Sequence, residues 1–171
     1  CSPGVVNGHL VRWTPLFRTI HNFFTATNSG MSKQQLMELQ TVAENGEVQG
    51  LRRLVEQQGV PVNSDLGEIN SEAPGTTALH RSAYENHRDA VVALVNELGA
   101  DLTAVTTERG QTPLHWAATN NSVEAMIALI ELGADTTAVD NDGMTAFQRG
   151  AQSGHRGLRA SVEAAIPGPL P

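Results

Sequence analysis

The chain has 171 residues, of which 40% are hydrophobic, 4% aromatic and 17% charged, and its formal net charge is −7. The length suggests one domain, and the acidic balance argues against a nucleic-acid partner, because phosphate binding needs a basic surface. A single cysteine, Cys1, excludes an intramolecular disulfide and a cysteine-based zinc site, and no apolar run approaches the ~20 residues of a membrane span.

Residues 1–30 differ in composition from the rest of the chain. They carry Arg12 and Arg18 with several aromatic, Ser and Thr residues but no Asp or Glu, which is typical of an organelle transit peptide. The simpler interpretation, which we favour, is a flexible segment of upstream sequence without a role. The chain begins with Cys. Met31, the first residue of a helix-like stretch, is a candidate for the first residue of the natural protein.

Apolar residues then recur at helical spacing in successive segments. Low aromatic content and many Ala, Val and Leu residues suit closely packed helices better than a barrel or sandwich. The positions that define the buried helix faces are Leu51, Leu54 and Val55; Val91, Leu94, Val95 and Leu98; and Val123, Met126, Ile127 and Ile130.

Two short blocks repeat in register along the same part of the chain. Segments that align begin at Thr77 (Thr-Ala-Leu-His), Thr112 (Thr-Pro-Leu-His) and Thr145 (Thr-Ala-Phe-Gln), and their first residues lie 35 and 33 positions apart. A second block, Leu-Gly-Ala-Asp-x-Thr-Ala-Val, begins at Leu98 and Leu132. A degraded earlier copy fits the frame with Met37 at the Thr position and an enlarged loop from Ser64 to Gly75.

This pattern resembles the ankyrin repeat family. The resemblance implies an all-α ankyrin-repeat solenoid of about four helix–turn–helix units with short β-hairpin-like loops, followed by a tail at 167–171. The units expected within an ankyrin domain at 31–166 are 33–63, 73–105, 108–139 and 141–166.

Local signals agree with these units. Thr112 is expected to cap a helix with Pro113 at its first position, and Gly99 and Gly133 suit the left-handed C-terminal position. The sequence from Asp140 to Gly143 predicts a projecting turn, as does Glu108-Arg-Gly. Polar replacements in the last unit predict a capping repeat, since each unit buries its apolar face only against a neighbour.

The six histidines indicate no metal or catalytic site. The resemblance implies that His80 and His115 are structural and bond the backbone of neighbouring loops. Ser82 lies near His80 in sequence, but nothing suggests a nucleophile–base pair with an orienting acid. No histidine pair has the spacing of a zinc site with a third ligand, and no phosphate-binding loop is present. We therefore expect no enzyme activity, no catalytic or metal-binding residue and no cofactor.

A protein partner is the better hypothesis. The resemblance implies binding along the concave face and hairpin tips by a non-catalytic adaptor, inhibitor or scaffold that is a monomer or part of a hetero-complex. The expected contact residues are Arg81, Tyr84, Glu85, Glu108, Arg109, Gln111, Trp116, Thr119, Asn120, Asp142, Met144 and Arg149.

One row of positions favours an anchor. The fourth residue after each motif Thr is Arg81, Trp116 and Arg149 in turn, which predicts a tryptophan stacked between two arginines, with Tyr84 beside it. The alternative is that Trp116 only fills the groove between units.

Two other functions stay open. Glu-Arg-Gly followed by Thr-Pro-Leu-His-Trp-Ala is similar to the ankyrin module of some protein palmitoyltransferases, so the chain is alternatively a recognition arm of a larger enzyme. A further alternative is a subunit of a large organellar assembly, in which residues 1–30 form an extended arm against neighbouring subunits. We expect a cytoplasmic or nuclear location, or an organellar one if residues 1–30 are a transit peptide.

Overall fold

The structure is a computed structural model. The residues that it describes are 5–6, 9–10, 31–67 and 73–166. The expectations for the first 30 residues and for the tail at 167–171 therefore lie outside the described residues, apart from the short antiparallel strands β1 (Val5–Val6) and β2 (His9–Leu10).

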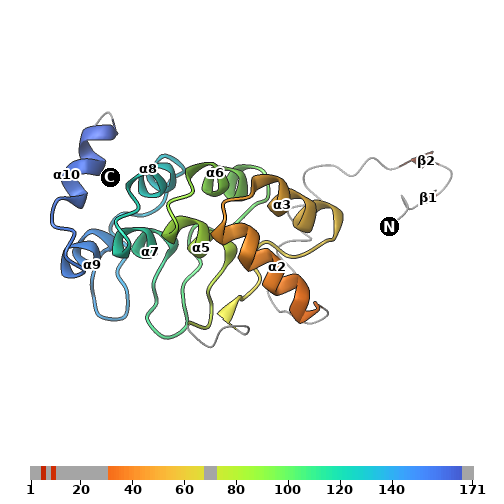
Figure 1. Ribbon diagram of the computed structural model, residues 1–171, viewed down its shortest axis with the longest axis horizontal. Coiled ribbons are helices and arrows are strands. Elements are labelled where there is room, and N and C mark those ends of the chain that lie inside the picture. Colours follow the sequence, from red (N-terminus) through yellow and green to blue (C-terminus); the bar gives the residue numbers. More distant parts are fainter. Residues whose placement is uncertain (1–4, 7–8, 11–30, 68–72, 167–171) are drawn as a thin grey trace.

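Two layers of helices run along the molecule, and the connecting hairpins extend from one layer away from the other (Figure 1). The first-helix layer consists of α2 (Lys33–Glu44), α5 (Ala78–Tyr84), α7 (Pro113–Thr119) and α9 (Ala146–Gln152). The second-helix layer consists of α3 (Val48–Arg52) with the π-helical turn η1 (Arg53–Gln57), α6 (Arg88–Asn96), α8 (Val123–Glu131) and α10 (Leu158–Ala165). Each helix contacts its counterpart in the next unit, so the all-α solenoid prediction is confirmed.

The caps explain where the inner first helices begin. The Thr112 side chain and the His115 side chain form a reciprocal capping box, and Pro113 occupies the first turn, where its missing N–H costs nothing. The glycines predicted after α6 and α8 take left-handed conformations, with φ of 75° at Gly99 and 95° at Gly133. These local signals were therefore sufficient to place the helix ends.

The first unit departs from the repeat frame. Its first helix, α2, has 12 residues, whereas α5 has 7. Ser32 and Gln35 form a capping box five positions before Met37, so Met37 lies inside the helix instead of at its cap and is 52% exposed. The extra turn arises because a good cap was available upstream of the degraded motif.

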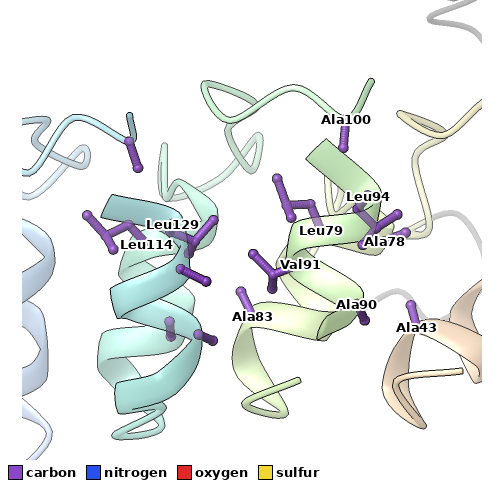
Figure 2. Close-up of a cluster of buried hydrophobic side chains, with 14 of the residues drawn as sticks. Ala43, Ala78, Leu79, Ala83, Ala90, Val91, Leu94, Ala100, Leu114 and Leu129 are labelled. Carbon is purple, nitrogen blue, oxygen red and sulfur yellow. The ribbon is translucent and has the colours of Figure 1, made fainter. Parts of the chain in front are cut away.

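The core lies between the two layers and continues from unit to unit (Figure 2). Leu79 and Leu94 of one unit and Leu114 and Leu129 of the next are almost completely buried. Full burial of each such side chain is worth about 1.5–3 kcal/mol, and alanines such as Ala83 keep the neighbouring helices close. Stability therefore depends on stacking, as expected for units that cannot bury their faces alone.

Successive hairpins are tied to one another by backbone hydrogen bonds. The Thr107 N–H donates to the Pro74 carbonyl at 2.7 Å, and the Asn141 N–H donates to the Arg109 carbonyl at 2.9 Å. Within the last described hairpin, Val139 and Thr145 form an isolated antiparallel bridge. The hairpins thus form a continuous edge beside the first-helix layer.

Candidate partner-binding groove

Trp116 belongs to α7, and its side chain contacts α5 of the preceding unit. Its ring makes edge-to-face contacts with His80, at a centroid distance of 5.5 Å, and with Tyr84, at 5.9 Å. The Arg81 guanidinium carbon lies 5.4 Å from the centroid of the Trp116 ring. The predicted stacking of Arg81 on Trp116 is therefore present, and the aromatic cluster joins two neighbouring units.

A hollow of about 180 Å³ opens beside this cluster. Its lining residues are Tyr84, Gln111, Trp116 and Thr119, and none of them carries a charge. Tyr84 and Thr119 end the first helices of adjacent units, and Gln111 precedes the cap of α7. The repeat geometry thus places a small, largely apolar depression between two neighbouring units.

The indole N–H of Trp116 is buried and has no hydrogen-bond partner among the residues that the structure describes. Indole nitrogen is a donor only, and a buried donor left unpaired costs about 1–3 kcal/mol. The N–H has almost no accessible surface, so the contacts of the ring with α5 hold it there at that cost.

His80 fixes the floor of the cluster. Its Nε2 lies 3.0 Å from the Gln111 carbonyl oxygen, and its Nδ1 lies 3.0 Å from Thr77 Oγ1. A carbonyl can only accept, so Nε2 carries the proton and Nδ1 accepts. Burial lowers the pKa of His80 to about 4, which keeps the ring neutral at physiological pH. The side chain is therefore a structural link between units.

His115 repeats this link one unit later. Its Nε2 lies 2.9 Å from the Met144 carbonyl oxygen, and burial lowers the pKa of this ring as well. The structural role that the sequence predicted for both histidines, bonding backbone between neighbouring loops, is confirmed by these contacts.

The end of α5 is held in place by the next unit. The Asn120 amide donates to the Tyr84 carbonyl at 2.8 Å, and the Ser122 hydroxyl donates to the same oxygen at 2.5 Å. Because both donors come from the turn after α7, the Tyr84 backbone cannot shift independently of Trp116. The two aromatic residues therefore form a preorganised pair.

The predicted stacking of Arg149 on Trp116 is wrong. Arg149 is 7% exposed, and its guanidinium donates to the Asp140 carboxylate, through Nε at 2.8 Å and through Nη2, and to Asp142 at 2.7 Å. A buried cation needs anionic partners more than an aromatic face. Burial alone would raise the pKa of Asp140, but hydrogen bonds from Arg149 and from backbone N–H groups lower it overall.

Comparisons with known proteins agree with this geometry. A family model for ankyrin repeats in three copies matches residues 99–160, and a single-repeat ankyrin model matches residues 75–107, so together they cover half of the chain. This chain belongs to the ankyrin repeat family.

Similar proteins include several palmitoyltransferases. The chain is 35% identical over 98 residues to palmitoyltransferase Hip14 of Drosophila melanogaster, an alignment that covers 57% of this chain and 14% of that protein. It is 27% identical over 129 residues to palmitoyltransferase ZDHHC17 of Danio rerio, covering 72% and 18% respectively. Ankyrin repeat protein nuc-2 of Neurospora crassa is 32% identical over 88 residues, covering 52% and 8%. The chain spans less than a fifth of these relatives.

Half of the predicted contact residues meet around the hollow of this ankyrin array. The others lie at the hairpin tips, where Glu108 and Arg109 are exposed, at the exposed Glu85, and in the last described unit. Of that last group, Met144 is half-buried and Asp142 is exposed. The residues that the structure brings together are Arg81, Tyr84, Gln111, Trp116, Thr119 and Asn120.

Two exposed valines were not among the predicted contact residues. Val105 is 51% exposed and Val139 is 58% exposed, and they occupy equivalent places at the start of successive hairpins. The recurring Ala-Val that ends the second sequence block was the signal that could have revealed them. They extend the apolar surface available on the ankyrin hairpins.

Other kinds of site find no support in the described part of the chain. No group of three or more His, Cys, Asp or Glu side chains there could hold a metal ion. None of the helices in those residues has the length and apolar character to cross a membrane. Ser82 is buried and donates its hydroxyl hydrogen to the Ala43 carbonyl at 3.0 Å, which is a packing role.

Proposed function

We propose that residues 31–166 form a non-catalytic protein-interaction module, an adaptor, inhibitor or scaffold, whose partner lies along the groove between the first helices and the hairpins. The observation that carries this proposal is the hollow beside Trp116, whose lining is uncharged and largely apolar. Ankyrin arrays are interaction modules in general, and this hollow is the anchor that we propose for the present one.

The composition of the anchor supports the proposal. Tryptophan, tyrosine and arginine dominate the energetically important residues of protein interfaces, and here Arg81 and Tyr84 both contact Trp116. Their positions are set by helix packing and by hydrogen bonds from the next unit, so little ordering is needed on binding. A partner that fills the hollow would gain apolar contact with both aromatic rings.

Charged residues would form the rim of the interface. Glu85, Glu108 and Arg109 are exposed around the anchor, and Asp142 lies at the tip of the next hairpin. Exposed charges of this kind affect the rate and specificity of association more than its affinity. The proposed complex therefore has an apolar centre and a charged periphery, the usual organisation of an interface.

Site-specific photo-crosslinking in cell extract tests the proposal. A benzophenone amino acid at the exposed Glu85, next to Tyr84, is expected to give a discrete cross-linked protein, whereas the same group at Asn96, exposed at the end of α6 in the second-helix layer, gives none. The Glu85 product should disappear when Trp116 is changed to Ala. Equal products from both positions, or a product that ignores Trp116, would contradict the proposal.

A second candidate is favoured by the similarity to palmitoyltransferases. In that case the array would be the substrate-recognition arm of a longer enzyme, since the aligned part makes up 14–18% of Hip14 and ZDHHC17. The full-length transcript distinguishes the two. A downstream apolar span with an Asp-His-His-Cys motif would support the enzyme arm, and a transcript without them would leave a stand-alone module.

A further inference from the structure

We infer that Arg149 is a positioning residue for the proposed binding edge, because it fixes two neighbouring hairpin tips. The outer tip comprises residues 141–143, and the inner tip comprises residues 108–110, directly before Gln111 of the hollow. The inference rests on the proposed function, since the inner tip carries rim residues of the proposed interface. A continuous series of hydrogen bonds from a buried guanidinium to an exposed turn supports it.

The outer tip is built around one buried carboxylate, that of Asp140. Its Oδ1 accepts the N–H groups of Asp142 and Met144, each at 3.0 Å, and the Asp140 N–H donates to the Met144 carbonyl at 2.9 Å. An aspartate that pairs with the backbone two residues further on is a common turn former. Because the Asp140 side chain is buried, its charge needs a cation as well as these backbone donors.

Arg149 supplies that cation from the following helix, α9. Its guanidinium contacts Asp140 Oδ2 through Nε at 2.8 Å and through Nη2, and Nη2 also donates to Asp142 Oδ2 at 2.7 Å. One planar group therefore holds the residue before the outer tip and a residue within it. A lysine ammonium is a single point charge and does not reproduce this geometry.

Asn141, which lies between these two aspartates, connects the outer tip to the inner tip. Its N–H donates to the Arg109 carbonyl and its side-chain amide donates to the Glu108 carbonyl, both at 2.9 Å. A Cβ atom on Gly110 would lie 2.6 Å from Asn141 Oδ1, so the two tips are in close contact. Any shift of Asn141 therefore moves or releases the backbone of the inner tip.

The inner tip is held by neutral groups instead of an ion pair. Thr106 occupies the place of Asp140, because its N–H pairs with the Gln111 carbonyl across the hairpin, and its hydroxyl oxygen accepts the Gln111 N–H at 3.1 Å. The helix position that corresponds to Arg149 is held by the uncharged Trp116 in this unit. The hydrogen bonds from the outer tip are therefore a large part of what orders the inner tip.

Amide hydrogen exchange of the full chain, followed by NMR, tests the inference without a partner. Arg149→Lys keeps the cation but loses the planar fork, so the Gly110 N–H, which donates to the Thr106 carbonyl, should exchange about tenfold faster. The Val60 N–H, bonded to the Leu54 carbonyl in the first unit, is the internal reference and should exchange at an unchanged rate.

Two further variants show whether the effect passes through Asn141. Gln152→Ala is the matched control: it removes another hydrogen-bond partner of Arg149, at 2.9 Å, outside both tips, and should leave Gly110 exchange unchanged. Asn141→Ala removes the donor to the Glu108 carbonyl and should speed Gly110 exchange about as much as Arg149→Lys does. Combining the two should add less than about a further twofold, because both break the same route.

The outcomes separate this inference from the proposed function. Unchanged Gly110 exchange in Arg149→Lys, an equal acceleration at Val60, or effects that multiply in the double variant would each overturn the inference and leave the interaction module intact. Cross-linking then tests the consequence for binding. A benzophenone group at Arg109 should give severalfold less product in Arg149→Lys than in the otherwise unchanged chain, whereas the Glu85 product should persist. A chain without any Glu85 product would contradict the proposed function, whatever the exchange rates show.

Discussion

The inner units and the last described unit use the same motif positions for different purposes. In the inner units, His80 and His115 cap their own helices and reach the carbonyls of Gln111 and Met144 in the following hairpin. In the last described unit, Gln148 stands at the same position and caps only its own helix, receiving the Thr145 N–H at 2.8 Å. A histidine at this position links units, and a glutamine ends the link.

The position one residue further along shows the same contrast. Arg81 stacks on Trp116 at the inner interface, whereas Arg149 is buried against Asp140 and Asp142. Arg81 also forms an ion pair with Glu44 of the preceding unit at 3.8 Å, so it joins two units, whereas Arg149 stabilises its own hairpin. Equivalent positions in this repeat array therefore differ in whether their anionic partner comes from another unit or from the same hairpin.

Removing the Arg149 guanidinium should have the largest effect on stability. Arg149→Leu leaves the buried Asp140 carboxylate without its cation and should lower the free energy of unfolding by about 3–5 kcal/mol. Glu163→Gln is the matched control, because it breaks the exposed ion pair with Arg159, leaves that guanidinium over the Phe147 ring and should cost less than about 1 kcal/mol. Urea unfolding monitored by circular dichroism measures both. Similar losses would refute the contrast between the two units.

Replacing the linking histidine should cost more than replacing the terminal glutamine. His80→Ala leaves a void and removes one of the two donors to the Gln111 carbonyl, so we expect a loss of about 3 kcal/mol. Gln148→Ala removes one cap hydrogen bond and should cost about 1 kcal/mol or less. The same urea titrations compare them. An equal cost would mean that the link between hairpins contributes nothing.

Acid should weaken the inner interface through the same histidine. Burial lowers the pKa of His80 from 6.5 to about 4, so the unfolded chain binds more protons between these values and stability rises with pH. The contribution is complete above about pH 6.5 and is lost as the pH falls towards 4. At about 1.4 kcal/mol per pKa unit, the loss is at most about 3 kcal/mol. His80→Gln should flatten this part of the profile in urea titrations at several pH values, and an unchanged profile would contradict the assignment.

Breaking a surface ion pair in the second-helix layer should have the smallest effect. Arg52 and Glu97 form a two-point contact at 2.6 and 2.8 Å between the first two units, but both side chains are exposed. Such pairs gain little in water. Arg52→Gln should therefore leave the urea midpoint within experimental error. A clear decrease in the urea midpoint would show that this ion pair of the second-helix layer also stabilises the contact between units.

The sequence was sufficient for the repeats and for part of the groove. Regular spacing of Thr77, Thr112 and Thr145 located the inner helices, and the Trp116 and Arg81 positions indicated their contact. The same reasoning placed Arg149 on the aromatic row because it considered helix positions alone. The turn residue Asp140 folds back against that helix, and its charge determines where Arg149 points.

Two further features depended on three-dimensional information. The hollow is formed by Tyr84 and Trp116 from different units, and its depth follows from how closely α5 and α7 pack. The unpaired indole nitrogen could not be inferred from sequence, because any nearby carbonyl might have been its partner. The extended α2 followed from a cap at Ser32 that lay outside the repeat motif.

The most direct test of the account compares binding and stability in one variant, Trp116→Ala. The protein recovered by cross-linking from Glu85 is titrated against the wild-type chain and the variant, and urea unfolding is measured on the same samples. We predict at least a tenfold loss of affinity in buffer without urea, where the unfolding curve shows that the variant is fully folded. A variant that loses stability but binds its partner with unchanged affinity would show that Trp116 only packs between units, and would contradict the proposed groove.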